Sequence, residues 1–217
     1  AIQQTRGEWI AFLDCDDIWF SQKLAKQIEL VPKQDVNTGI VYGGMVIISG
    51  KTANVSRWSK NLRRAVSKQD HQKLIEGEIF AKLLQLNFIP MLSSLVRKSL
   101  YLEVGGIDSK LNQVEDYDLF LKISKVSKAK VVRENICAYR VHEGNATLNQ
   151  LDKNFQEAIQ VVSCYLPEMA AKKGMRCHQT YYAIHEFRNG LIIKPLSRLI
   201  LKGSLVVLFK KIYIFFR

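Results

Sequence analysis

The sequence predicts an α/β domain with a mixed, mainly parallel sheet, followed by a helical appendage. Two observations support this fold class. Apolar runs of strand length alternate with segments of helical spacing through the first 150 residues. After that point, helical spacing dominates the rest of the chain. We therefore expect a sheet-bearing domain over 1–150 and a helical C-terminal extension over 151–217.

The individual elements follow from local patterns. Residues 8–14 are an apolar run that ends in acids, which is typical of a strand buried on both faces. Leu24, Ile28 and Val31 share one face of a predicted helix, and Pro32 follows its end. Similar patterns predict strands over 39–49, 89–96 and 130–139, and helices over 75–86, 97–104, 115–125, 154–166 and 179–189.

Composition narrows the class of protein. The chain has 217 residues, of which 47% are apolar and 24% charged, so a disordered, collagen-like or disulfide-stapled chain is excluded. Its net charge of +12 indicates an anionic partner, such as a phosphorylated substrate, an anionic lipid or a nucleic acid. The four cysteines are far apart and form no CxxC pair, which favours reduced thiols in the cytoplasm.

Three carboxylates, those of Asp14, Asp16 and Asp17, follow the first predicted strand within four residues. Like charges this close repel one another, and a divalent cation removes the repulsion. Mg²⁺ and Mn²⁺ prefer such oxygen ligands and often share them with substrate phosphates. The alternative is a solvated turn whose acids cap the next helix.

Two further segments carry polar side chains suited to chemistry. Glu115 and Asp116 open a predicted helix, where a carboxylate is held firmly and suits a general base. Helix capping and compensation of the helix dipole are the alternative explanation. After the strand at 130–139, Arg140 offers a bidentate phosphate clamp and His142 a metal ligand, unless both are structural hydrogen-bonding residues of a turn.

Together these segments resemble glycosyltransferase family 2, the inverting nucleotide-sugar transferases of the GT-A fold. Gly7-Glu-Trp-Ile-Ala-Phe-Leu-Asp-Cys-Asp-Asp-Ile-Trp19 is similar to the strand that enters the family's DxD motif. Gly105-Gly-Ile-Asp108 precedes Glu115-Asp116 as a similar loop precedes the family's acidic pair. Tyr139-Arg-Val-His142 resembles its Tyr-Arg-x-His segment. The resemblance covers about 1–150 and implies a partial GT-A fold.

The resemblance implies a role for each of these residues. Asp16 and Asp14 would bind Mg²⁺ or Mn²⁺ and the donor, with His142 as a further metal ligand. Arg140 would contact the donor phosphates. Asp116 would be the catalytic base, with Glu115 as its neighbour. The implied reaction is the transfer of a sugar, of hexosyl type, from a nucleotide-diphosphate donor such as a UDP-sugar to a hydroxyl of a cell-surface polysaccharide or lipid-linked glycan.

The front of the family's catalytic domain has no counterpart in this chain. Its first nucleotide-binding strands normally precede the segment that Ala1 begins, so we expect an N-terminally truncated domain over 1–150 that by itself binds donor weakly. A non-catalytic remnant or a membrane-associated interaction module is the alternative to an enzyme. Nucleic-acid binding is a rival suggested by the basic stretch 51–73, but no nucleic-acid motif is present and we expect none to bind.

The C-terminal segment combines apolar and basic residues. From Phe187 to Arg217 there are seven basic residues and no acid, and Lys194, Arg198 and Lys202 are four apart. This pattern is typical of a helix in a membrane interface with its cations toward anionic headgroups. The alternative is an amphipathic helix packed on the domain. We expect 190–217 to hold the protein peripherally at the inner, cytoplasmic face of the plasma membrane.

Overall fold

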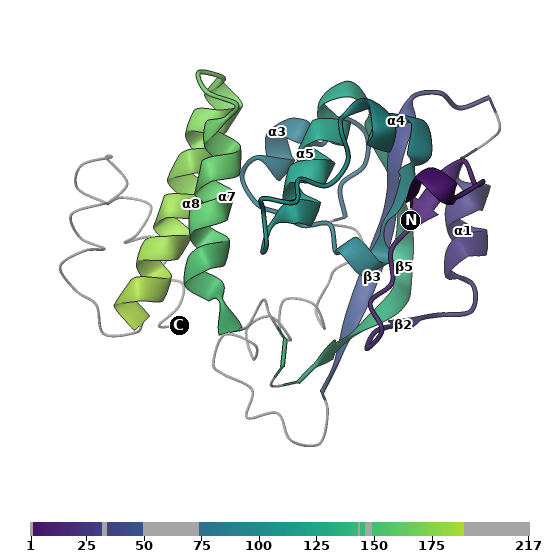
Figure 1. The fold of residues 1–217 in the computed structure, drawn as a ribbon, viewed down its shortest axis with the longest axis horizontal. Helices are drawn as coiled ribbons and strands as arrows, with labels where there is room; N and C mark the ends of the chain where they lie inside the picture. Colours follow the sequence, from purple (N-terminus) through teal and green to yellow (C-terminus); the bar gives the residue numbers. More distant parts are fainter. Residues whose placement is uncertain (1, 32–33, 50–73, 143, 146–148, 189–217) are drawn as a thin grey trace. The chain divides into compact units, whose positions relative to one another are not determined.

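The computed structural model describes residues 2–31, 34–49, 74–142, 144–145 and 149–188 (Figure 1). The chain divides into two compact units. The first contains Ala1–Phe80 and Asn87–Asn149 and carries the sheet with most of the short helices. The second contains Ala81–Leu86 and Gln150–Arg217 and carries two longer helices.

The first unit is built on a five-stranded sheet of order β1-β4-β3-β5-β2, whose strands are β1 (Trp9–Ala11), β2 (Ile18–Trp19), β3 (Thr38–Ser49), β4 (Leu95–Arg97) and β5 (Lys128–Val141). The predicted α/β class and mixed sheet are confirmed. Among the described strands, only the pairing of β3 with β5 is parallel, and the other three pairings are antiparallel. By paired residues the sheet is mainly parallel, as predicted, because the β3–β5 ladder is longer than the three antiparallel ladders together.

The strand directions place the polar segments at the same end of the sheet, where strands β1 and β5 finish. β1 and β3 both run antiparallel to β4, and β3 runs parallel to β5, so β1, β3 and β5 point the same way. The acidic cluster follows β1, and His142 follows β5. Open α/β sheets bind ligands outside the carboxyl ends of their strands, which is where both segments lie.

The core of this unit lies between the central strand β3 and helix α5 (Glu115–Val126). Ile40, Val41 and Tyr42 are completely buried, as expected for a strand covered on both faces. At Gly39 an added Cβ would lie 2.8 Å from a methyl carbon of Ile123 on α5 and 2.1 Å from the Ser127 hydroxyl. Glycine at this position therefore allows the end of α5 to approach the start of β3.

Some short helices and strands have other bounds than the sequence predicts, because contacts with distant segments override the local sequence pattern. The helix predicted over 75–86 is reduced to α3 (Phe80–Leu83), because Gly77 forms a two-bond bridge with Ala129 of β5. The strand predicted over 89–96 begins late, since Pro90 leads into the 3-10 turn η3 (Met91–Ser93). The remaining short elements of the unit are η1 (Ile2–Gln4), α1 (Lys23–Glu29) and α4 (Lys98–Glu103).

The edges of the sheet also depart from expectation. The strand predicted over 8–14 is β1, in which Ile10 is buried while Trp9 and Ala11 are partly exposed. This strand is less covered than predicted because it lies at one edge of the described sheet. The opposite edge strand, β2, has only two residues and was not predicted.

The second unit contains helices α7 (Leu151–Ser163) and α8 (Met169–Arg188). Gly174 lets α8 pack closely within this unit, because a Cβ there would lie 2.3 Å from the Leu84 carbonyl oxygen. No helix among the described residues is long and apolar enough to cross a bilayer. The predicted interfacial segment 190–217 and the basic stretch 51–73 lie outside the described residues.

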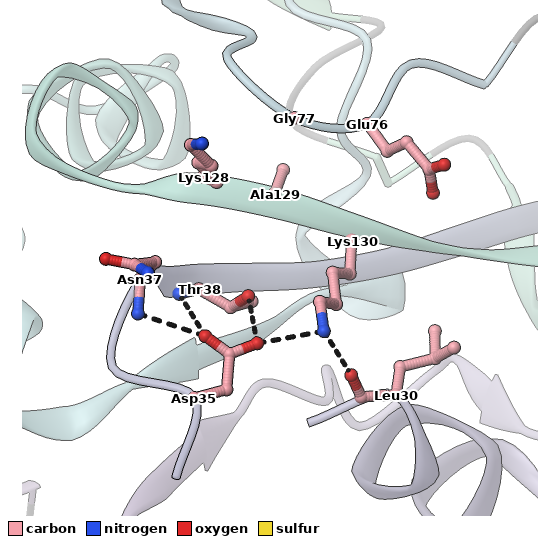
Figure 2. A pocket seen from close by; sticks show the side chains of 9 residues that line it. All are labelled: Leu30, Asp35, Asn37, Thr38, Glu76, Gly77, Lys128, Ala129 and Lys130. Atoms are coloured by element: carbon pink, nitrogen blue, oxygen red, sulfur yellow. Dashed lines mark hydrogen bonds and ion pairs between the residues drawn. The ribbon is translucent and has the colours of Figure 1, made fainter. Parts of the chain in front are cut away.

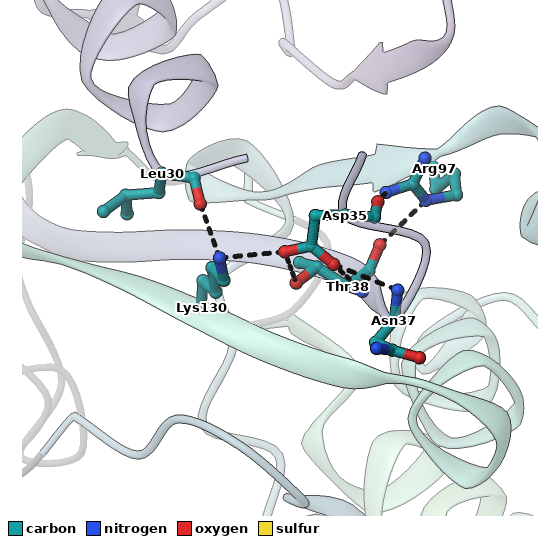
Figure 3. Close-up of polar contacts among 6 residues, drawn as sticks. All are labelled: Leu30, Asp35, Asn37, Thr38, Arg97 and Lys130. Carbon is teal, nitrogen blue, oxygen red and sulfur yellow. Dashed lines mark hydrogen bonds and ion pairs between the residues drawn. The ribbon is translucent and has the colours of Figure 1, made fainter. Parts of the chain in front are cut away.

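An ion-pair network centred on Asp35 joins α1 to the sheet (Figure 3). One carboxylate oxygen accepts hydrogen bonds from the backbone amides of Asn37 and Thr38, each 3.0 Å long. The other accepts from the Thr38 hydroxyl and from Lys130 Nζ, each at 2.8 Å. Lys130 also donates to the Leu30 carbonyl at 2.7 Å, just past the end of α1.

Arg97 extends the network to β4. Its Nε donates to the Thr38 carbonyl at 2.8 Å, and its guanidinium also bonds the Asp35 carbonyl (Figure 3). The guanidinium carbon stands 4.6 Å from the ring centre of Trp9 on β1. The starts of β3 and β5 are thus tied to α1, β4 and β1 by side chains rather than by the sheet alone.

Replacing Asp35 by Asn is expected to lower the free energy of unfolding by about 1–3 kcal/mol at pH 7. The hydrogen bond from Lys130, followed by those from Thr38 and Asn37, holds the pKa of Asp35 far below its usual range. A depressed folded-state pKa stabilises the protein above about pH 4 and loses this effect as the pH falls further. Urea denaturation at pH 7 and pH 3 measures both values, with the exposed-site variant Glu103→Gln as control. An equal loss at both pH values would contradict the ionic role.

Candidate functional site

The acidic cluster and the end of β5 meet in the folded chain. The Asp16 carboxylate lies 2.7 Å from His142 Nε2, although 126 residues separate them. Arg140 Nε donates to the Asp16 carbonyl at 2.9 Å, and the Arg140 amide donates to the Asp17 carboxylate at 2.8 Å. Asp14 is exposed at the start of the cluster. The structure thus brings Asp16, Arg140 and His142 together, with Asp17 as a further member.

Hydrogen bonds around His142 fix the direction of its ring. The Gly144 amide donates to His142 Nδ1 at 3.1 Å, so in the neutral ring the proton is on Nε2 and faces Asp16. Asn145, which is buried, accepts from the His142 amide at 2.5 Å and donates to the Arg140 carbonyl at 3.2 Å. His142 therefore supports the Asp16 carboxylate, and its role as a direct metal ligand stays a prediction.

The two acids of this cluster have different electrostatic environments. The hydrogen bond from His142 is the main reason that the pKa of Asp16 lies below its usual value. Burial is the main reason that the pKa of Asp17 lies above it. The second carboxylate oxygen of Asp17 is buried, and no atom of the described residues forms a hydrogen bond with it. Buried polar atoms normally have partners, so this orphaned oxygen fits a site that binds something beyond the protein.

The carboxylate oxygens of the acidic cluster suit a hard cation that takes few of its ligands from the protein. In the part of the chain that the structure describes, no three His, Cys, Asp or Glu side chains are grouped to hold an ion. Mg²⁺ and Mn²⁺ do not require such a cage, because they take oxygen ligands and leave positions to water and substrate phosphates. The carboxylates of Asp14 and Asp16 supply oxygens of this kind.

The second acidic pair lies in the first turn of α5. The Asp116 carboxylate accepts from the Tyr117 amide at 2.6 Å and from the Asn87 side-chain amide at 3.5 Å. Burial raises the pKa of Asp116 to about 7, and the charge of Glu115 adds to the rise. One oxygen of Glu115 is buried and has no hydrogen-bond partner within the part of the chain that the structure describes. Asp118 instead forms an ion pair with Lys122 at 2.6 Å, which agrees with a structural role.

Three side chains that follow the acidic cluster in the sequence, those of Trp19, Lys23 and Gln27, bond backbone carbonyls of residues 92–94. We call these three side chains the clamp. The Trp19 indole donates to the Leu92 carbonyl at 3.0 Å. The carbonyls of the next two residues, Ser93 and Ser94, are bonded by Gln27 at 2.9 Å and by Lys23 at 3.4 Å. Lys23 is 1% exposed, and its ammonium stands 4.3 Å from the ring centre of Trp19.

Sequence reasoning missed this clamp. The available signal was the spacing of Lys23 and Gln27, which are four residues apart and therefore adjacent on one helix face. Their side chains bond each other at 2.8 Å. Because both are polar, they fall outside an apolar pattern, and their burial was not predicted.

A separate pocket lies at the opposite end of the sheet from His142. It has a volume of about 660 Å³ and opens beside the starts of β3 and β5 (Figure 2). Its lining includes the Asp35 network and none of the predicted site residues, and consists of Leu30, Asp35, Asn37, Thr38, Glu76, Gly77, Lys128, Ala129 and Lys130. The pocket therefore surrounds a structural ion pair rather than the candidate site.

Comparison with known proteins decides the family. The family model described as glycosyltransferase like family 2 matches residues 1–186. The chain belongs to this family. The predicted resemblance is therefore confirmed, and the match extends beyond the 150 residues on which it was based.

Curated relatives support this family assignment. An uncharacterized glycosyltransferase of Rickettsia typhi is 27% identical over 162 residues, which cover 70% of this chain and 46% of that protein. An uncharacterized glycosyltransferase of Haemophilus influenzae is 22% identical over 160 residues, covering 73% of this chain and 50% of the relative. The family 2 chain thus spans about half the length of these relatives.

Proposed function

We propose that the chain is part of an inverting glycosyltransferase that moves a sugar from a nucleotide-diphosphate donor to an acceptor hydroxyl. The observation that carries this proposal is the meeting of Asp16 with Arg140 and His142 in a member of glycosyltransferase-like family 2. A UDP-sugar is the proposed donor, and a cell-surface polysaccharide or lipid-linked glycan is the proposed acceptor.

Asp16 and Asp14 would hold the cation, and Arg140 would contact the donor phosphates. When bound, Mg²⁺ or Mn²⁺ would offset the negative charge of the departing diphosphate. His142 donates to Asp16, which orients the carboxylate and holds its pKa below the usual value. The Asp17 oxygen that has no hydrogen-bond partner among the described residues is in keeping with a bound group at this site.

Asp116 would act as the general base. The acceptor hydroxyl gives its proton to the Asp116 carboxylate while its oxygen forms a bond to the anomeric carbon. The bond from that carbon to the diphosphate oxygen breaks on the opposite face, and the leaving group takes the electron pair. One such displacement inverts the anomeric centre. A pKa of about 7 suits this role, because a base works best when its pKa is near the working pH.

The test of this function is donor turnover by the complete gene product. The protein is incubated with Mn²⁺ and a panel of nucleotide sugars, and release of nucleoside diphosphate is measured with and without a metal chelator. The proposal expects chelator-sensitive release with at least one donor and a product of inverted configuration by NMR. A folded protein that turns over no donor would instead support a non-catalytic interaction module.

We propose further that 190–217 attaches the protein to an anionic membrane surface. The support is compositional, since 187–217 contain seven basic residues and no acid among many apolar ones. Vesicles containing anionic lipid should float the protein, and deletion of 190–217 should abolish flotation. Equal flotation of both forms would overturn this attachment.

A further inference from the structure

We propose that Asn87 is a positioning residue that orients the Asp116 carboxylate for proton transfer. The inference rests on the proposed function, because it assigns a partner to the base of that reaction. Its starting point is the contact of 3.5 Å between Asn87 Nδ2 and Asp116 Oδ2. The contact is long for a hydrogen bond, as is common for catalytic contacts that tighten when substrate binds.

The Asn87 amide is fixed so that its donor end faces the base. Its carbonyl oxygen accepts from the Ile89 backbone amide at 3.3 Å. Since the oxygen is occupied there, the NH₂ group is the end directed toward Asp116. Ile89 itself is 2% exposed, so the amide that orients Asn87 belongs to a packed residue.

The segment that carries Asn87 is anchored a few residues further along. The carbonyls of Leu92, Ser93 and Ser94 are bonded by the clamp of Trp19, Gln27 and Lys23. Trp19 follows the acidic cluster by two residues. The segment that follows Asn87 is therefore held by side chains that come shortly after Asp16 in the sequence.

The two oxygens of Asp116 have complementary donors. The Tyr117 amide bonds Oδ1 at 2.6 Å, and within the described residues Asn87 is the side chain that bonds Oδ2. One donor on each oxygen defines the plane of the carboxylate. Each oxygen has two lone pairs, so Oδ2 can still accept a proton from a substrate hydroxyl.

The neutral amide also suits the chemistry of a base. Among the described residues, Glu115 on the same helix is the group whose charge raises the pKa of Asp116, in addition to burial. The Asn87 amide opposes this effect by hydrogen bonding, without adding a positive charge. A Lys or Arg at this position would hold the carboxylate ionised but would make it a weaker base.

The test compares Asn87→Ala and Asn87→Asp with wild type in the complete gene product. The acid limb of kcat/KM is expected near pH 7 in wild type and at higher pH in both variants, because a bond to the charged form is lost and Asn87→Asp also adds a like charge. We expect kcat to fall roughly 10- to 100-fold through misorientation, while the donor KM changes less than about twofold. Gln85→Glu is the matched control, since Gln85 bonds only its own turn at Ala81 in the described structure.

Each outcome has a distinct meaning. If wild type turns over donor and the Asn87 variants keep the same pH profile and kcat, the positioning role is overturned and the proposed function stands. Absence of turnover in wild type would overturn the proposed function, and this role with it. Asn87→Asp is nearly isosteric with wild type. If its thermal unfolding midpoint equals that of wild type, a changed pH profile belongs to folded protein.

Discussion

Replacing Asp116 by Asn is expected to lower kcat of the complete gene product by a factor of about 10²–10⁴. The amide has almost the same shape but cannot accept the proton of the acceptor hydroxyl at neutral pH. Donor affinity should be unchanged, because the proposed donor ligands, Asp16 and Arg140, are untouched. Steady-state turnover gives the first quantity, and calorimetric titration with donor and Mn²⁺ gives the second.

Asp118→Asn is the matched control for this substitution. Asp118 belongs to the same turn of α5, but its carboxylate pairs with Lys122 rather than with the Asn87 amide. Its variant should lose stability and keep most of its turnover per folded molecule. Near-normal turnover by Asp116→Asn would remove Asp116 from the role of base.

Replacing Asp16 by Asn is expected to abolish the metal dependence of donor binding and to lower turnover roughly 10²–10³-fold. The substitution removes the negative charge that would hold the cation. Donor affinity measured with and without Mn²⁺ distinguishes the two variants, since Asp116→Asn should keep the metal effect and Asp16→Asn should lose it.

Asp152→Asn is the control for this second prediction. Its carboxylate is 67% exposed on α7 and pairs with His185, outside the candidate site. It should retain metal-dependent donor binding. If Asp16→Asn also retained it, the assignment of Asp16 as the cation ligand would be wrong.

Much of the fold was predictable because the patterns that form it are local. The apolar run of β3, the acid-led helix α5 and the strand β5 all lie close to where the sequence indicates them. The chemistry of each candidate site segment was predictable from its residues, but only the family resemblance indicated that the segments act together. Nothing in the spacing of Asp16 and His142 predicts that residues 126 positions apart make contact.

The features that were missed depend on contacts between distant segments. Gly77 lies in a segment whose sequence pattern predicts a helix, but it pairs with Ala129 of β5. The helix therefore begins only after this bridge, at Phe80. Strand direction is likewise a property of the pairing partner, so the antiparallel β1 and β4 could not be read from either strand alone. Lysine is typical of protein surfaces, yet Lys23 is buried, and its ammonium bonds the Ser94 carbonyl 71 residues away.

The most direct test of the account is a crystal structure of the complete gene product with Mn²⁺ and a nucleoside diphosphate. Anomalous scattering locates the ion without reference to any expected ligand. We expect one Mn²⁺ peak between the Asp16 carboxylate and the diphosphate, in a cleft that the Asp116 carboxylate also lines. A peak at another place, or a wall of protein between Asp16 and Asp116, would contradict a single site in which one carboxylate holds the cation and the other takes the proton.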